Sequence, residues 1–280
     1  MSDRPYRITA RQHVTWDQFH AIVKQRPNRS PHEVWGNSSI DRSTFRRKFT
    51  LTRSLPHALQ VAAQGWPEGR ERMLQGIEHD TEGNVPSLFP AREYDVAGEW
   101  PDVAAYCAGV PEHMVSQGEA SLTGAPVVRI GINGVYPAST SSESIHNFGI
   151  ALLSHVAAYQ RAGYSVALDW HSLAASDGKV CWTRVEILSA GGTIDLDRLA
   201  FMLAHPAMVR RMWFGFIEQY PEASFIQQGY GHNVPHHKIE GWEYDGVMLP
   251  PLIEVPTYTV ETAAEAIGRV IEGEPAAQAA

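Results

Sequence analysis

Five side chains in the middle of the chain carry the functional groups that binding and catalysis need. Asn133 follows an apolar run, and the hydroxyls of Ser139 and Ser141 come shortly after it. A second apolar run is followed by Asp169 and His171. An amide, hydroxyls, a carboxylate and an imidazole can exchange protons, hold a polar ligand or ligate a cation. We therefore predict that these residues form a binding site.

Each of these groups also has an ordinary structural use. Thr140 and Glu143 fit a capping box, in which the two side chains satisfy the first amides of a helix. Asp169 could close a turn through its own side chain, as Asp often does. The structural uses are the more common ones, so the sequence favours them over binding at each position taken singly.

Three histidines nearer the end of the chain are a second candidate site, for a metal. They lie within six residues and are His232, His236 and His237. Imidazole is a common ligand of Zn²⁺, but no cysteine and no H-E-x-x-H motif accompanies them, so the composition favours a polar loop. We expect no bound cofactor, with Mg²⁺ or Zn²⁺ as the alternatives.

The elements that must position these residues form a strand–helix–strand unit. The first strand is predicted at 127–132, and a helical repeat of apolar residues then continues to Gly163. A second strand is predicted at 164–170, which implies two parallel strands joined by a helix. Because parallel sheets bind ligands at the carboxyl ends of their strands, the polar residues are expected at that edge. A hairpin turn is predicted at 177–178.

We predict an α/β fold with a Rossmann-like, mostly parallel sheet flanked by helices. Composition divides the chain into a helical and loop-rich extension at 1–124, an α/β core domain at 125–272 and a disordered tail at 273–280. Within the extension, Thr15 and Ser54 are suited to cap helices. The predicted site lies entirely in the core domain.

Charge and composition disfavour several classes of protein. The chain has 280 residues, and its 23 Lys and Arg against 31 Asp and Glu give a formal net charge of −8, which disfavours a nucleic-acid partner. Its 2 cysteines cannot build a disulfide framework, as is usual in a reducing compartment. No run approaches the ~20 apolar residues of a membrane span, and no secretory signal is recognisable. We expect a cytoplasmic protein without a membrane partner.

Two motifs resemble uncharacterised proteins of tailed bacteriophages and prophages. The first is Gly-Trp-Pro-Glu-Gly at 65–69, and the second is Asp-Val-Ala-Gly-Glu-Trp-Pro-Asp-Val at 95–103. The resemblance covers about residues 45–220. It implies a phage or mobile-element origin and the cytoplasm of a bacterial host cell, and it brings no known activity or site residues.

The core separately resembles a von Willebrand A-like domain, from Val127 to about Ile271. Domains of that class hold Mg²⁺ with an Asp and two hydroxyls that follow the first strand. Here Asn133 stands in the place of the Asp, and Ser139 and Ser141 come several residues late, so charge that a hard cation needs is missing. The resemblance implies a degenerate domain that binds a protein partner and is not an enzyme.

Three functions remain open from the sequence. The first is an interaction protein that binds a protein partner through the edge formed by 133–142 and 169–172. The second is a metal-dependent enzyme that acts on nucleic acid or nucleotides through the aspartate and histidine of that edge and the histidines near His236. The third is a DNA-associated phage factor that uses the basic residues 46–48.

Overall fold

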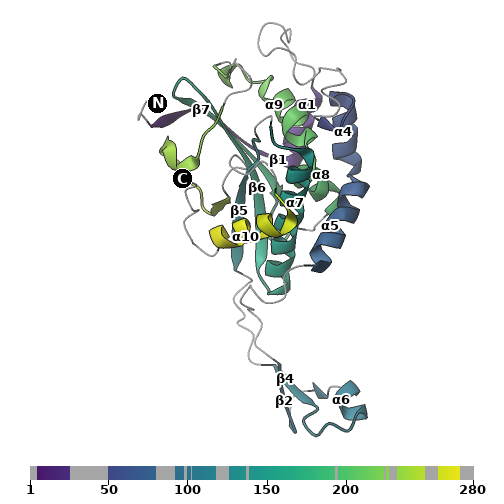
Figure 1. The fold of residues 1–280 in the computed structure, drawn as a ribbon. Helices are drawn as coiled ribbons and strands as arrows, with labels where there is room; N and C mark the ends of the chain where they lie inside the picture. The colour runs from purple at the N-terminus through teal and green to yellow at the C-terminus, as the bar shows by residue number, and fades with distance from the viewer. Residues whose placement is uncertain are drawn as a thin grey trace.

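The computed structural model places a mostly parallel sheet at the centre of the molecule (Figure 1). Helices cover one face of this sheet, and the segment 241–246 crosses the other. The structure describes residues 5–25, 50–79, 92–97, 100–101, 103–117, 126–136, 139–192, 195–223, 225–226, 232–249 and 258–271.

Six strands follow one another in the order β10-β5-β6-β7-β1-β9, and β8 pairs beside β6. They are β1 (Tyr6–Thr15), β5 (Val127–Asn133), β6 (Ser165–Ser176), β7 (Lys179–Leu188), β8 (His232–Asn233), β9 (Ile239–Glu240) and β10 (Val247–Leu249). Neighbours in this order are parallel except β6 and β7, which form an antiparallel hairpin. The predicted α/β class with a mostly parallel sheet is confirmed, and the finer Rossmann-like or von Willebrand A-like assignment stays a prediction.

The predicted strand–helix–strand unit is present as β5, α7 (Ser142–Arg161) and β6. β5 and β6 are parallel neighbours whose register is continuous along the whole of β5. Between α7 and β6, Gly163 has a φ of 98°, a conformation that glycine adopts without steric cost. The hairpin turn predicted at 177–178 joins β6 to β7, and both of its residues have positive φ, as this kind of turn requires.

Two strands differ from the sequence prediction. β6 continues to Ser176, so Asp169 and His171 lie in the middle of a strand and not past its carboxyl end. Their polarity ended the apolar run early, although each has a cross-strand partner on β7. β1 lies between β7 and β9, so the segment predicted as an extension at 1–124 contributes a strand to the sheet of the core.

The helices form a layer over the sheet face that bears the larger apolar core. They are α1 (Trp16–Lys24), α4 (Leu55–Gln64), α5 (Pro67–His79), α7, α8 (Leu196–Ala204), the π-helix η1 (Met208–Trp213) and α9 (Phe214–Ile217), with α10 (Val260–Ile271) packed on α7. Thr15 and Ser54 cap α1 and α4 as predicted. Ser141, and not Thr140, caps α7, so an adjacent hydroxyl replaces the predicted cap.

The segment 241–246, here named the strap, crosses the other face of the sheet. It connects β9, which pairs with Arg7 of β1, to β10, which pairs with Ile130 of β5. β9 and β10 are the two outermost strands in this order. Followed across the sheet, Arg7 is aligned with Ser176 of β6 and Ile130 with Leu168, so the two pairings are also far apart along the strand direction. The chain from β9 to β10 reaches at most ~25 Å, whereas five strand spacings of ~4.8 Å already span about that width in a flat sheet. The sheet must therefore curl around the strap.

A small unit of three strands and one helix lies apart from the main sheet in Figure 1. It consists of β2 (Arg92–Asp95), β3 (Trp100–Pro101), α6 (Val103–Cys107) and β4 (Met114–Gln117). β4 is the central strand and is antiparallel to both of its neighbours. The described residues of the second phage-like motif, 95–97, 100–101 and 103, lie in this unit and not in the main sheet.

Some sequence predictions concern residues outside the described ranges. These are the basic residues 46–48 and the tail at 273–280. None of the helices that the structure describes combines the length and the apolar character that a membrane crossing requires.

Candidate functional site beneath the strap

Asp169 is the centre of a buried ionic cluster on the strap-covered face of the sheet. Its side chain is 0% exposed, and its Oδ2 accepts hydrogen bonds from Arg129 Nη1 at 3.0 Å and from Arg184 Nη2 at 2.9 Å. The hydroxyl of Tyr244, in the strap, donates to the same oxygen at 3.0 Å. A carboxylate is tolerated away from water only when it is paired in this way. Asp169 thus links β5, β7 and the strap to β6.

The alternation of side chains along the strands brings this cluster together. Arg129 and Arg184 lie on the strands that flank β6, on the same face as Asp169. Gly131 lies directly opposite Asp169 in the β5–β6 register. A Cβ at this glycine would lie 2.8 Å from the Tyr244 ring, so a larger residue would occupy space that the ring fills. The missing side chain on β5 therefore lets the strap approach the carboxylate.

The strap is held by more than one contact. Asp245 pairs with Arg129 Nε at 3.5 Å, and the Arg184 guanidinium lies over the Tyr244 ring at 5.5 Å from its centre. Burial, followed by the nearby Asp169 carboxylate, raises the pKa of Tyr244, so the phenol remains protonated and donates its hydrogen bond. These contacts fix the strap over the ionic cluster.

His171 lies next to this cluster and is surrounded by aromatic rings. Its ring centre is 4.8 Å from that of Tyr244, 5.8 Å from that of Trp242 and 6.1 Å from that of Trp182. Burial, assisted by Arg184, lowers the pKa of His171 to about 3, so the imidazole is neutral near pH 7. Trp182 Nε1 donates to His171 Nδ1 at 3.0 Å, and an indole N–H can only donate. The neutral ring must then carry its proton on Nε2, which is available as a donor.

Three buried polar atoms at this place have no hydrogen-bond partner among the described residues. They are Asn133 Nδ2, Asp169 Oδ1 and His171 Nε2. Asn133 and His171 are opposite one another in the parallel β5–β6 register, and Asp169 is two positions before His171 on the same strand face. Buried polar groups normally have partners, because leaving one unpaired costs about 1–3 kcal/mol. Their gathering at adjacent positions leaves hydrogen-bonding capacity that a polar group, such as a water molecule or a ligand, could use and that the described residues do not fill.

Donors and positive charge predominate at this place. The amide of Asn133 and the imidazole of His171 present N–H groups, and among the described residues of the site Asp169 Oδ1 is the one unpaired acceptor. Two guanidinium groups face one buried carboxylate, that of Asp169. Asp245 has a side chain that is 74% exposed, and Glu186, opposite Asp169 in the β6–β7 register, is only partly buried, so water screens both of these carboxylates. The site therefore has a local excess of positive charge in a chain whose net charge is negative.

The five predicted site residues fall into two separate groups in the structure. Asn133, Asp169 and His171 come together beneath the strap, each 2% exposed or less. Ser139 is exposed, and Ser141 caps α7 by accepting a hydrogen bond from the Ser144 amide. The predicted contact edge is therefore not one surface, because its carboxylate, amide and imidazole are buried and cannot touch a protein partner while the strap is in place. Binding by these five side chains, together or apart, stays a prediction.

The predicted metal candidates do not assemble into a ligand set among the described residues. No group of three or more His, Cys, Asp or Glu side chains lies close enough there to hold an ion. His236 is partly buried, with its ring centre 6.2 Å from that of Trp242, and His237 is exposed. The side chain of His232 lies outside the described residues. At the strap-covered site, the described unpaired groups are mostly N–H donors, which do not ligate a cation.

Sequence reasoning missed the partners that make Asp169 and His171 a site. Arg129 and Arg184 interrupt apolar strands, and a charged residue inside such a strand is a usable signal because burial demands a partner. Trp242 and Tyr244 gave no such signal, since they lie in a polar stretch far along the chain and reach β6 only through the path of the strap.

Comparisons with known proteins place the chain in a family without assigning it a role. Neither the comparison with curated proteins nor that with solved structures gave a match. The predicted phage origin is tested by none of these findings and stays a prediction. Residues 15–268, which contain the sheet from the end of β1 onward and all of the strap-covered site, match one family of proteins. The chain belongs to that family, which is described as a domain of unknown function, DUF7192.

Proposed function

We propose that the protein binds a small molecule with an anionic oxygen group and a flat apolar body, in the site beneath the strap. The observation that carries this proposal is the set of unpaired buried atoms contributed by Asn133, Asp169 and His171. A ligand that supplies oxygen acceptors would remove the cost of leaving the two donors unpaired.

The anionic group follows from the balance of charges and donors. An imidazole Nε2–H, an amide and the remaining N–H groups of two guanidiniums favour a carboxylate or phosphate over a cation or a neutral donor. Because His171 is neutral near pH 7, its contribution is a hydrogen bond and not a charge. Arg129 and Arg184 supply the charge, and Asp169 holds them in place.

We infer the flat apolar body of the ligand from the aromatic side chains at the site. Trp182 and Trp242 have ring centres 4.3 Å apart, and both lie near the imidazole of His171. Aromatic side chains prefer offset or edge contacts with other rings, so a planar group entering here would gain contacts that a branched aliphatic group would not. The site thus pairs a polar end with an apolar end, as small-molecule sites commonly do.

Entry requires the strap to move. Its attachment includes the Tyr244 hydrogen bond and ring contact with Arg184, the Asp245 ion pair and the packing of Trp242, and no disulfide fixes it among the described residues. Gly241, at its start, has a φ of 70°, which favours glycine and marks a point where the backbone can turn sharply. Ligand binding is therefore expected to exchange strap contacts for ligand contacts.

The test is titration of the protein with benzoate and with benzamidinium, which have the same flat shape and opposite charge. We expect saturable binding of benzoate by calorimetry, with a change in tryptophan fluorescence, and no binding of benzamidinium. Asn133→Leu removes the amide donors at nearly constant volume and should weaken benzoate binding about ten-fold.

The matched control is Asn147→Leu, which removes another amide donor, one that bonds the Tyr258 carbonyl at 2.6 Å on the helical side of the sheet. It should leave benzoate affinity unchanged. Equal binding of the two probes, or no binding of benzoate at millimolar concentration, would rule the proposal out and leave ordered water as the partner of the unpaired atoms.

A further inference from the structure

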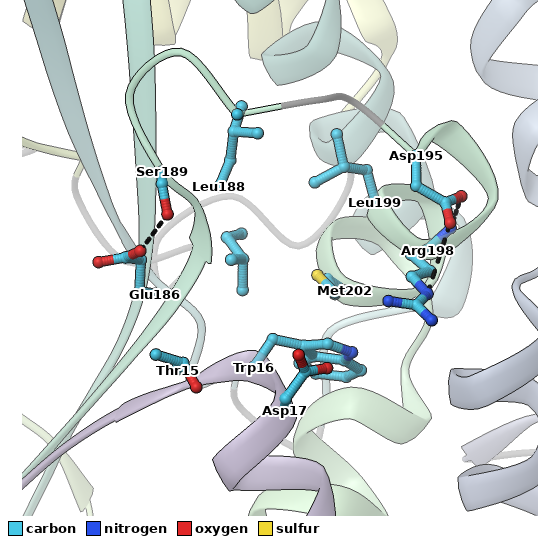
Figure 2. A pocket seen from close by; sticks show the side chains of 12 residues that line it. Thr15, Trp16, Asp17, Glu186, Leu188, Ser189, Asp195, Arg198, Leu199 and Met202 are labelled. Carbon is cyan, nitrogen blue, oxygen red and sulfur yellow. Dashed lines mark hydrogen bonds and ion pairs between the residues drawn. The ribbon is translucent and has the colours of Figure 1, made fainter.

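A pocket of about 370 Å³ lies between helix α8 and the carboxyl ends of β1 and β7 (Figure 2). Two pairs of its polar side chains already satisfy each other, since Ser189 donates to Glu186 and Arg198 Nε lies 3.4 Å from Asp195 Oδ2. No lining residue in the described part of the chain contributes a buried polar atom without a partner. The unsatisfied capacity for hydrogen bonds is concentrated instead beneath the strap.

The carboxylate of Asp169 uses its two oxygens unequally. Oδ2 accepts hydrogen bonds from two guanidinium groups and from the Tyr244 hydroxyl, while Oδ1 accepts none from the described residues. A guanidinium commonly binds both oxygens of a carboxylate at once, and here two of them converge on the same oxygen. A fully buried acceptor is therefore left near the two unpaired donors, Asn133 Nδ2 and His171 Nε2.

Hydrogen bonds that are already made fix the direction of these two donors. Trp182, on β7, donates to His171 Nδ1, so Nε2, on the other side of the imidazole, is turned away from β7 and toward β5. Asn133 is the β5 residue opposite His171, and its Oδ1 accepts from the Val135 amide, which leaves Nδ2 as the unpaired group. One oxygen-bearing group placed between the two side chains can accept from both.

The unpaired acceptor lies close to this pair of donors along β6. Positions 169 and 171 share one face of the strand and are ~6.6 Å apart, and a hydrogen bond joins heavy atoms that are ~2.8 Å apart. Two such bonds, one to His171 Nε2 and one to Asp169 Oδ1, take up most of that distance. A single ligand that makes both must therefore carry its acceptor and its donor on neighbouring atoms.

We propose that the ligand of the strap-covered site is a 2-hydroxycarboxylate with a flat aromatic body. This assignment rests on the function proposed above and names the class of its ligand. The carboxylate accepts from Asn133 and His171, and the adjacent hydroxyl donates to Asp169 Oδ1. The aromatic body lies against Trp242, whose ring centre is 5.8 Å from that of His171.

Charge distinguishes a hydroxyl from an amine as the donor of the ligand. Arg129 and Arg184 exceed the single buried carboxylate by one positive charge, which one ligand carboxylate balances. A hydroxyl adds no charge, whereas the ammonium of an amino acid would restore the excess in a place where water screens charges poorly. The site therefore favours a hydroxy acid over the amino acid of the same shape.

Calorimetry of the full chain with phenylacetate, mandelate, O-methylmandelate and phenylglycine tests this inference, since the four probes share one ring and one carboxylate. Mandelate adds the hydroxyl, and its better-bound enantiomer should bind about ten-fold more tightly than phenylacetate, the scale of one net hydrogen bond. O-methylmandelate cannot donate, and phenylglycine carries an ammonium, so neither should bind more tightly than phenylacetate. Equal affinity for mandelate and phenylacetate, or tighter binding of O-methylmandelate or phenylglycine than of mandelate, would overturn the inference.

Benzoate separates this inference from the function on which it rests. Binding of benzoate and phenylacetate without a preference for mandelate would leave an anion site in place and exclude the hydroxy acid as its ligand. If none of these carboxylates binds at millimolar concentration, both proposals fail.

One variant tests the role of the unpaired oxygen. In Asp169→Asn the amide oxygen is expected to face the two guanidinium groups, which leaves an NH₂ group where Oδ1 stood. The variant should therefore lose the preference for mandelate over phenylacetate, and a retained preference would contradict the role of Oδ1. If the variant does not fold, the comparison of mandelate with O-methylmandelate on the unaltered protein still decides.

Two control variants locate the binding. Asp177→Asn makes the same chemical change in the exposed hairpin turn and should leave both affinities unchanged. Arg198→Gln removes the guanidinium at the pocket of Figure 2 and should also have no effect. A loss of mandelate affinity in Arg198→Gln would place the binding in that pocket and contradict the assignment.

Discussion

The two faces of the sheet are built from the same strands by opposite means. On the helix-covered face, Ile130, Leu168 and Trp170 are buried in a large apolar core under a layer of helices. On the strap-covered face, the residues that alternate with them include Arg129, Asp169 and His171, beneath a single short segment of chain. Alternation along two strands thus separates a face that stabilises the fold from a face with unsatisfied polar atoms.

Stability and recognition are therefore expected to reside on different faces of the sheet. The apolar face gains free energy from burial in proportion to area. The polar face offsets part of this favourable free energy, because its charges are removed from water and three of its atoms lack partners among the described residues. A polar arrangement of this kind is common at functional sites, where local cost is balanced by stability elsewhere.

The largest effect is expected at the centre of the polar face. Asp169→Ala leaves Arg129 and Arg184 without the carboxylate between them and should lower the free energy of unfolding by about 3–5 kcal/mol. Urea unfolding measures this directly. Asp245→Ala is the control, since that carboxylate is largely exposed and should cost less than about 1 kcal/mol. If both variants lose the same small amount, the buried cluster does not stabilise the fold.

On the apolar face, Leu168→Ala should cost about 2–5 kcal/mol, because the removed atoms leave a cavity in a fully buried core. The same variant should leave benzoate binding unchanged at temperatures where it is folded, since its side chain faces the helices. Urea unfolding and calorimetry, applied to one sample, give both values. A loss of affinity with Leu168→Ala would mean that the two faces are not independent.

Acid should destabilise both faces through buried histidines. The pKa of His171 is lowered to about 3 and that of His205, among the helices, to about 3, in both cases mainly by burial, against 6.5 in the unfolded chain. Below pH 6.5 the unfolded state binds more protons than the folded one, so stability is full above that pH and falls as the pH decreases. Each histidine contributes a slope of at most ~1.4 kcal/mol per pH unit.

The variants His171→Gln and His205→Gln should therefore each flatten the pH dependence of unfolding between pH 6.5 and about 4, by a similar amount. Urea unfolding at several pH values measures the slopes. Only His171→Gln should also change benzoate binding. An unchanged slope in His171→Gln would show that this imidazole is not held neutral by burial.

A smaller effect is expected at the strap. Tyr244→Phe keeps the ring and removes the hydrogen bond to Asp169, at a cost of about 1–2 kcal/mol. Hydrogen exchange should become faster for amides of the strap and stay the same for those of α7. The smallest effect is expected for Arg7→Gln, since the ion pair with Glu240 is exposed and should contribute less than about 1 kcal/mol. A larger loss there would mean that β9 depends on this pair.

The sequence predicted the elements whose signals are local. The helical repeat before Gly163 predicted α7 between β5 and β6, and the turn residues at 177–178 predicted the hairpin. Both signals come from residues that are close together in the sequence. The length of β6 was missed because Asp169 and His171 look like the end of a strand unless their partners are known. Those partners come from β5, β7 and the strap, and no local pattern connects Tyr244 to Asp169 across 75 positions.

One consequence of the strap concerns the margins of the sheet. Because a single stretch of chain begins at β9 and finishes at β10, it supplies the outermost strand on each side. Unpaired strand margins are templates on which other chains assemble. A protease cut within 241–246 would sever the link between the two outer strands, and any loss of their pairing would uncover β1 or β5. The cleaved protein would then be prone to self-association into fibrous aggregates, although its helical layer would be untouched.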